Sequence, residues 1–201
     1  MLTVITPTAK RDLTTLDAVK LELGITDGAA DTYLAGLIGQ ASRAIESWCG
    51  RIFAREDVRE AVHLTEPAAV LLLSRFPLAA ITSVTTEAGS LAPALYEADA
   101  ETGMLYRLTA SGARSVWSPG RIVVDYAAGF LLPGEEGRTL PADIERAAIL
   151  AVRNAWHTRG RDQTVRSEDV DGVGSFSYGL PSSLPADVTD LLAPHRLPGF
   201  A

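Results

Sequence analysis

The chain has 201 residues, 47% of them hydrophobic, which is enough to build a sizeable core as one domain or as one domain with an arm. Its 18 basic and 25 acidic residues give a formal charge of −7, which argues against a protein that grips nucleic-acid phosphates, because such domains carry a basic surface. No apolar run approaches the roughly 20 residues that span a bilayer, and the apolar stretch before Lys10 is too short for a signal peptide. We therefore expect no membrane partner.

A single cysteine, Cys49, excludes an internal disulfide framework and is typical of a reducing compartment. We expect it to be a half-buried structural thiol near a helix end. Only Lys10 and Lys20 of the basic residues are lysines. Arginine is enriched at protein interfaces, although a codon bias across the genome would give the same composition.

The first part of the chain predicts a helical hairpin. Residues 1–13 read as an extended lead-in, because Pro7 blocks an early helix. A helix over 14–23 follows, with a threonine cap and an acid three residues on, and Gly24 ends it. A longer helix over 31–49 follows a short polar loop, which predicts that the two helices are antiparallel.

The longer helix carries its apolar residues at the spacing of one helix face. These residues are Leu34, Leu37, Ile38, Ala41, Ile45 and Trp48. Asp31 is the expected N-cap and Gly50 the expected left-handed C-cap. If Trp48 is buried, its truncation should cost about 3–5 kcal/mol.

Residues 54–130 predict a small, mostly antiparallel sheet of five or six strands, curled into a sandwich. The strand candidates are 58–64, 70–73, 81–86, 95–99, 104–108 and 122–126. Gly103 is the residue expected at positive φ in a hairpin loop, and the strand over 122–126 closes at Gly129.

A last long helix is predicted over 142–159, opened by Pro141, with Asp143 and Glu145 at its positive end. Its alanines permit close approach to another helix, such as 31–49. The predicted fold class is therefore α+β. A helical bundle, made of the N-terminal hairpin and this later helix, packs with the small sheet in a core over residues 1–160.

Residues 161–201 predict a C-terminal arm with a short helix over 186–192. Most of the stretch before that helix is polar, rich in glycine and without a helical or strand period. We expect the arm to order against a partner, with arginines and aromatics as anchors. A tail whose aromatics fold back on its own domain is the alternative. The candidate anchors are Arg159, Arg161, Arg166, Phe176 and Tyr178.

The sequence contains no pattern that predicts catalysis. His63, His157 and His195 have no second histidine or cysteine at metal-ligand spacing. There is no dinucleotide fingerprint, phosphate loop or nucleophile elbow. Acidic pairs such as Glu56–Asp57 lack the glycine-centred pattern of a calcium loop. We predict no catalytic residue, cofactor or metal; a small metal-dependent hydrolase or nuclease is the alternative from another class.

Several short motifs, in order along nearly the whole chain, resemble the head–tail connector (adaptor) proteins of long-tailed phages. Residues 13–53 match a short helix, an acidic turn and a long helix ending in an aromatic-x-Gly-Arg motif, here Trp48 to Arg51. The further matching segments are 76–78, 81–84, 123–130, 140–144 and 191–196.

The resemblance implies a structural part without an active site. Such proteins form a ring, typically twelvefold, under the portal of a filled capsid, and gene transfer agents use the same part. The ring extends the DNA channel, which DNA passes without sequence-specific binding, and it docks the next neck or tail protein. The implied location is the particle neck, assembled in the host cytoplasm. Another neck component, a stopper or a tail-completion protein, is the alternative.

The resemblance also implies roles for particular residues. The arm resembles the portal-docking element, so Leu191 and Leu192 join the candidate partner-binding residues. Arg51, directly after the long helix, is a candidate for the interface between neighbouring ring subunits. The formal charge of each subunit, multiplied around a ring, would give a negative collar that repels the DNA backbone.

Overall fold

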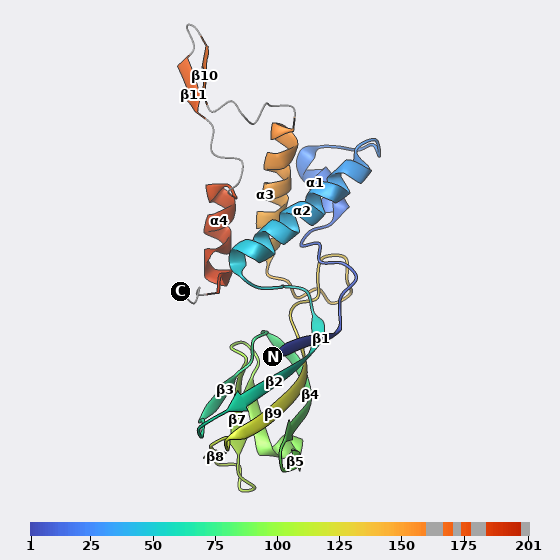
Figure 1. Cartoon of the computed structure of the whole chain (residues 1–201). Coiled ribbons are helices and arrows are strands. Elements are labelled where there is room, and N and C mark those ends of the chain that lie inside the picture. The colour runs from blue at the N-terminus through green and yellow to red at the C-terminus, as the bar shows by residue number, and fades with distance from the viewer. Residues whose placement is uncertain (160–166, 171–173, 178–183, 198–201) are drawn as a thin grey trace. The chain divides into compact units, whose positions relative to one another are not determined.

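The computed structural model describes residues 1–159, 167–170, 174–177 and 184–197, which fall into two compact units (Figure 1). Unit 1 comprises Met1–Arg11 and Ile52–Leu140, and unit 2 comprises Asp12–Arg51 and Pro141–Ala201. The backbone therefore passes between the units three times, after residues 11, 51 and 140. The predicted α+β class is confirmed. The division into a core over 1–160 and an arm over 161–201 stays a prediction.

Unit 1 contains a five-stranded antiparallel sheet. In spatial order its strands are β1 (Leu2–Thr6), β2 (Glu56–Leu64), β9 (Gly120–Ala128), β4 (Leu78–Thr86) and β5 (Gly89–Ser90). The segment predicted over 122–126 is the central strand β9, longer at both ends. The predicted extended lead-in contains a strand, because residues 2–6 form β1 and pair with β2.

A second sheet of unit 1 holds β3 (Val70–Leu72), β7 (Met104–Leu108) and β6 (Tyr96–Asp99), with β8 (Arg114–Ser115) also on β7. A single 3₁₀ turn, η1 (Pro93–Leu95), precedes β6. The hairpin predicted between β6 and β7 is confirmed, with Gly103 at φ 73°. A side chain there would also press on the carbonyl of Leu73, 3.2 Å from the added carbon.

Both sheets contribute to one hydrophobic core, as a sandwich requires. Val58 and Val124 come from the five-stranded sheet, and Leu71 and Leu105 from the other; all four are almost completely buried. Trp117, which follows β8, is 1% exposed, and its indole N–H donates to the Leu105 carbonyl at 3.1 Å. The predicted sandwich is therefore present within unit 1.

Gly129 ends β9 at a place where no other residue fits. Its φ is 107°, and an added Cβ would lie 2.4 Å from the carbonyl oxygen of Ala54. Its N–H donates to the Pro77 carbonyl at 2.9 Å, which ties the end of the strand to the start of β4. The predicted closing glycine is therefore required both by its backbone conformation and by close backbone packing.

Unit 2 contains four α-helices and a strand pair in its described residues. The helices are α1 (Leu16–Leu23), α2 (Asp31–Cys49), α3 (Ala142–Thr158) and α4 (Ala186–Leu192), followed by the 3₁₀ turn η2 (Ala193–His195). The strands β10 (Ser167–Val170) and β11 (Gly174–Ser177) pair with each other, antiparallel. All four predicted helices are confirmed within two residues at each end. The strand pair was not predicted, because its sequence lacks the apolar alternation of a buried strand.

The helix ends follow the expected chemistry at three of four positions. Thr15 caps α1 by accepting from the Ala18 N–H at 3.2 Å, and Gly24 and Gly50 end α1 and α2 in the left-handed conformation. The expected N-cap of α2 was wrong. Asp31 is the first helical residue and accepts instead from Lys20 Nζ at 2.7 Å, so it joins α1 to α2 as an ion pair.

The apolar face of α2 faces the interior of unit 2, with one correction. Leu34, Leu37, Ile38 and Ile45 are buried, and Val152 of α3 packs in the same cluster as the first three of them. Trp48 is only half-buried, and Cys49 takes the buried position at that end. The regular helix period of 3.6 residues places residue 49 about as well as 48, so burial was decided by the surrounding elements.

No helix among the described residues is both long and apolar enough to cross a bilayer.

Candidate interaction surfaces

The predicted ring residue Arg51 lies at the surface of unit 2, immediately after the C-cap of α2. Its backbone N–H donates to the Glu46 carbonyl at 3.1 Å, which satisfies one of the free carbonyls of the helix end. Its side chain is partly exposed. Burial lowers the pKa of the guanidinium, and the neighbouring Cys49 opposes that change. A ring-interface role for Arg51 stays a prediction.

The end of the described chain returns to this end of α2. The Leu197 N–H donates to the Cys49 carbonyl at 2.9 Å, and the Arg196 guanidinium lies over the Trp48 ring at 5.0 Å. Trp48 is therefore covered on one face by an arginine and does not enter the core. This contact joins the two segments of unit 2, which are far apart in the sequence.

Cys49 is fully buried beneath this contact, where a half-buried thiol was expected. Burial raises the pKa of the thiol to about 11, and Arg51 and Arg196 only partly oppose that shift. A buried, protonated thiol is a poor nucleophile. The expected structural role is thus supported by the geometry.

We expect Cys49 to resist a thiol reagent at pH 8 in the native chain and to react fully in 6 M guanidinium chloride. A pKa of about 11 makes the thiolate roughly a hundredfold rarer than in an ordinary cysteine. Because the native pKa is raised, this site stabilises the fold at and below pH 9 and loses that contribution as the pH rises toward 11. The rate of reaction with dithionitrobenzoate measures the reactivity of the Cys49 thiol. Fast native labelling at pH 8 would contradict the buried placement.

Helix α4 belongs to the core of unit 2. It packs against α3, and Val188 and Leu192 are both 0% exposed. Just after it, His195 Nε2 lies 2.7 Å from an Asp143 carboxylate oxygen in the first turn of α3. Leu191 is half-buried. The predicted partner contact of Leu192 stays a prediction, and it would require α4 to move away from α3.

An ion-pair cluster joins α1 to α3. Glu22 accepts from Arg146 at 2.7 and 3.2 Å and from Arg153 at 3.0 Å. The hydrogen bonds from Arg146 are the main cause that lowers the pKa of Glu22. Arg153 is therefore engaged inside unit 2.

A partly exposed group of aromatic and basic side chains lies at the last turn of α3 and the first turn of α2. The Trp156 ring lies 6.0 Å from the Tyr33 ring of α2, tilted by 50°, and the Arg159 guanidinium covers it at 3.6 Å. Arg159 also donates to the Trp156 carbonyl at 2.7 Å. Tyr33 is 48% exposed. We call Tyr33, Trp156 and Arg159 the aromatic–arginine stack; tyrosine, tryptophan and arginine are the residues that dominate binding energy at protein interfaces.

Unit 1 buries two carboxylates on the inward face of β2. Glu56 accepts from Arg11 at 2.6 Å and from Arg75 at 3.3 Å. Glu60 accepts from the Ser74 hydroxyl at 2.5 Å, the Ser74 N–H at 2.9 Å and the Tyr126 hydroxyl at 2.7 Å.

Both carboxylates are matched by donors from this chain, so neither is available as a general base. The network instead fixes the segment after β3 against the sheet. Burial is the main cause that raises the pKa of the Tyr126 hydroxyl, so this group stays a donor at neutral pH. The sequence contained the signal: Glu56 and Glu60 share the period of Val58, which predicts buried acids with partners.

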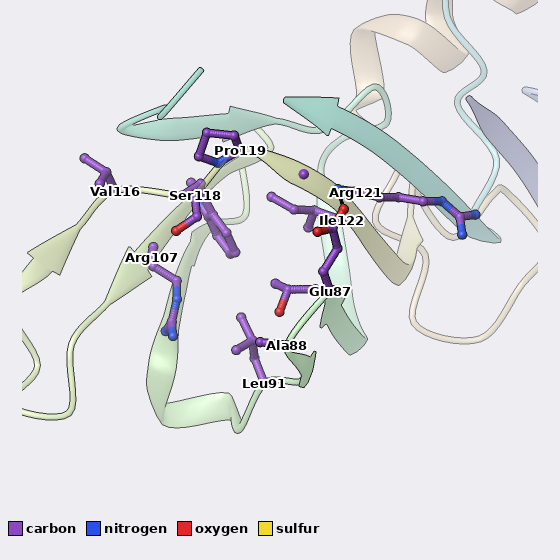
Figure 2. A pocket seen from close by; sticks show the side chains of 12 residues that line it. Glu87, Ala88, Leu91, Arg107, Val116, Ser118, Pro119, Arg121 and Ile122 are labelled. Atoms are coloured by element: carbon purple, nitrogen blue, oxygen red, sulfur yellow. Dashed lines mark hydrogen bonds between the residues drawn. The ribbon is translucent and has the colours of Figure 1, made fainter. Parts of the chain in front are cut away.

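A pocket of about 330 Å³ opens at one end of the sandwich, between the β4–β5 turn and the segment before β9 (Figure 2). Leu91, Trp117 and Ile122 supply its apolar wall. Glu87 accepts from the Arg121 N–H at 3.1 Å, and its carboxylate lies where a side chain on Gly120 would be.

The polar groups of this pocket are largely used within unit 1. Arg107 donates to the Leu95 and Leu108 carbonyls at 2.5 and 2.7 Å. The Arg121 side chain points away from the cavity (Figure 2). The lining also includes the Ser118 and Glu87 side chains beside the apolar wall (Figure 2).

Among the described residues, no three histidine, cysteine or acidic side chains converge in a way that could hold a metal ion. Glu56 and Asp57 are adjacent on β2, so one is buried and the other exposed, on opposite faces of the sheet. The exposed His63 and His157 lie on β2 and α3.

A model of the family described as HCP, head completion protein, matches residues 12–197. The chain belongs to the head completion protein family. The match covers parts of both units and every motif segment that resembled phage connectors. A search of curated proteins finds no match for this chain.

The chain shares its fold with chains of three solved assemblies. One is titled "Virion of native gene transfer agent (GTA) particle", with 21% identity and a TM-score of 0.60. The second is titled as the neck of an empty GTA particle computed with C6 symmetry, with 19% identity and a TM-score of 0.61. The third is titled as the neck of a native GTA particle computed with C12 symmetry, with 21% identity and a TM-score of 0.57. Each alignment covers 100% of this chain and 97% of the other.

The structure describes only some of the predicted arm residues. Arg161, Arg166 and Tyr178 lie outside the described residues, and Phe176 lies in β11. Their roles stay predictions. Sequence reasoning missed the aromatic–arginine stack as a unit, because Tyr33 is far from Trp156 in the chain and was not part of the apolar face.

Proposed function

We propose that the chain is the adaptor of the neck of a gene transfer agent or tailed-phage particle. In this proposal it forms a ring, twelvefold by the resemblance, below the portal. The ring extends the DNA channel and docks the next neck protein. The observation that carries the proposal is the family match over residues 12–197, supported by the full-length fold likeness to chains of GTA assemblies.

The negative net charge of the chain fits a protein that lines a channel through which DNA passes. A formal charge of −7 per chain becomes a strongly negative collar when it is repeated around a ring. Such a collar repels phosphates and leaves the polymer free to slide. No sequence-specific grip on DNA is part of the proposal, and neither is a reaction, a cofactor or a membrane.

We further propose that residues 161–183 dock the portal, with Arg161, Arg166, Phe176 and Tyr178 as anchors. The segment is polar and rich in glycine, which suits a strand of chain that binds along another surface. The segment contains the β10–β11 pair and is followed in the chain by α4, whose Val188 and Leu192 are buried in unit 2.

The docking proposal predicts that replacing residues 161–183 with a Gly/Ser linker of equal length abolishes incorporation into particles. The variant keeps α4, so its thermal unfolding midpoint should stay within about 2 °C of that of the parent chain. Immunoblots of purified particles measure incorporation. The matched control replaces the exposed turn 109–113 of unit 1 in the same way.

Normal incorporation of the linker variant would overturn docking through this segment. Another neck position is the competing proposal, since one of the similar assemblies was computed with C6 rather than C12 symmetry. An image of the neck from particles carrying a tagged chain separates the two. Density next to the portal supports the adaptor, and density at a lower ring supports a stopper or tail-completion protein.

A further inference from the structure

The register of the second sheet of unit 1 aligns apolar and acidic side chains in two rows on its outer face. Leu72 lies opposite Met104, which lies opposite Asp99. Val70 lies opposite Tyr106, which lies opposite Glu97. Directly opposed residues share one face of a sheet, so each row runs from an aliphatic residue on β3 to an acid on β6.

This outer sheet face exposes apolar side chains that a folded monomer usually buries. Leu72 is 61% exposed, and Val70 on the same strand is 36% exposed. Leu71 and its opposite residue Leu105 point the other way and are buried in the core. Clustered exposed apolar residues rimmed by charges mark a binding surface rather than ordinary surface scatter.

The charge of the rim decides which kind of partner fits. Glu97 and Asp99 are exposed, and Arg114 offsets part of this charge because its guanidinium lies 3.7 Å from Glu97 and 3.8 Å over the Tyr106 ring. Two such faces from two copies would bring their acidic edges together, which costs free energy. A symmetric contact of this face with itself is therefore disfavoured, and a partner with exposed aromatic and basic groups is favoured.

The chain carries such a surface itself. The aromatic–arginine stack of unit 2 offers the Tyr33 and Trp156 rings beside the exposed cation of Arg159. A ring of identical subunits needs two unlike surfaces that complement each other, one at each end of the repeat. The outer sheet face and the stack differ in charge sign and agree in apolar character.

We propose that the outer sheet face of one copy of the chain binds the aromatic–arginine stack of a second copy. This contact deepens the proposed function, on which it rests, by naming the surfaces that join neighbouring subunits of the ring. It assigns Arg159 to the subunit contact, and leaves portal docking to the residues beyond it.

The test mixes two variants of the full chain that each carry one introduced cysteine, Leu72→Cys and Tyr33→Cys, with a short bismaleimide cross-linker. Native Cys49 is buried, so it does not compete for the reagent. The control mixture replaces Leu72→Cys by Ile5→Cys, since Ile5 is 53% exposed but lies on β1 of the other sheet. We expect about tenfold more cross-linked dimer from the first mixture.

A charge exchange separates binding from mere proximity. Arg159→Glu in the Tyr33→Cys copy should return the yield to the control level, and Glu97→Arg in the Leu72→Cys copy should restore it. A first-mixture yield equal to the control, or no response to the charge variants, would overturn the contact. Cross-linking measures self-contact of the purified chain, whereas incorporation into particles measures the neck role, so either proposal can fail alone.

Discussion

A chain that ends at Arg159 should lose most of the stability of unit 2, although the sequence predicts residues 161–201 as an arm outside the core. The truncation removes α4, whose Val188 and Leu192 are fully buried. Burying each such side chain contributes about 1.5–3 kcal/mol, and the two together approach the whole stability of many domains. The truncation also removes the hydrogen bonds of His195 to Asp143 and of Leu197 to Cys49.

Urea unfolding followed by far-ultraviolet circular dichroism at 222 nm measures this loss, because the helices of unit 2 dominate that signal. The chain with the Gly/Ser linker over residues 161–183 is the matched control, since it keeps α4. We expect the control to unfold near the urea concentration of the parent chain and the truncation to unfold well below it. Equal midpoints for all three chains would mean that α4 does not stabilise unit 2.

Replacing Trp117 with alanine should lower the free energy of unfolding of unit 1 by about 3–5 kcal/mol. The ring is 1% exposed in the core shared by the two sheets, and its N–H bond to Leu105 is lost as well. Trp48→Ala is the matched control in unit 2. It should cost only on the order of 1 kcal/mol, because that ring is half-buried and one face meets Arg196.

Hydrogen exchange resolves the two tryptophan variants unit by unit. Trp117→Ala should speed the exchange of the amides of β9, while those of α2 keep their protection. Trp48→Ala should leave β9 unchanged. A larger effect from Trp48 than from Trp117 would contradict the burial of these two rings.

The helices were predictable because their signals are local. The apolar period, the threonine before α1 and the glycines after α1 and α2 all lie within a few residues of the ends that they define. The errors arose at positions whose side-chain partner lies far away in the sequence. Asp31 pairs with Lys20, and buried Ser42 of α2 accepts from the Leu13 N–H at 2.9 Å, a contact that no helix period contains.

The sheets and surfaces were less predictable for the same reason. β1 is a strand because β2 lies beside it, and Glu60 tolerates burial because Tyr126, 66 residues away, donates to it. Arg51 and Arg159 could be selected from sequence as arginines near helix ends. Their neighbours could not be selected, since the stack and the outer sheet face each combine elements that only the fold brings together.

The chain passes from one unit to the other three times, and this limits how a unit can be isolated or replaced by that of a relative. Unit 1 is made of Met1–Arg11 and Ile52–Leu140, and β1 from the first segment pairs with β2 from the second. Neither unit is therefore encoded by one uninterrupted stretch of the gene. A chimaera that borrows unit 1 from a relative must transplant both segments at once, with three junctions, or leave β2 as an unpaired edge prone to aggregation.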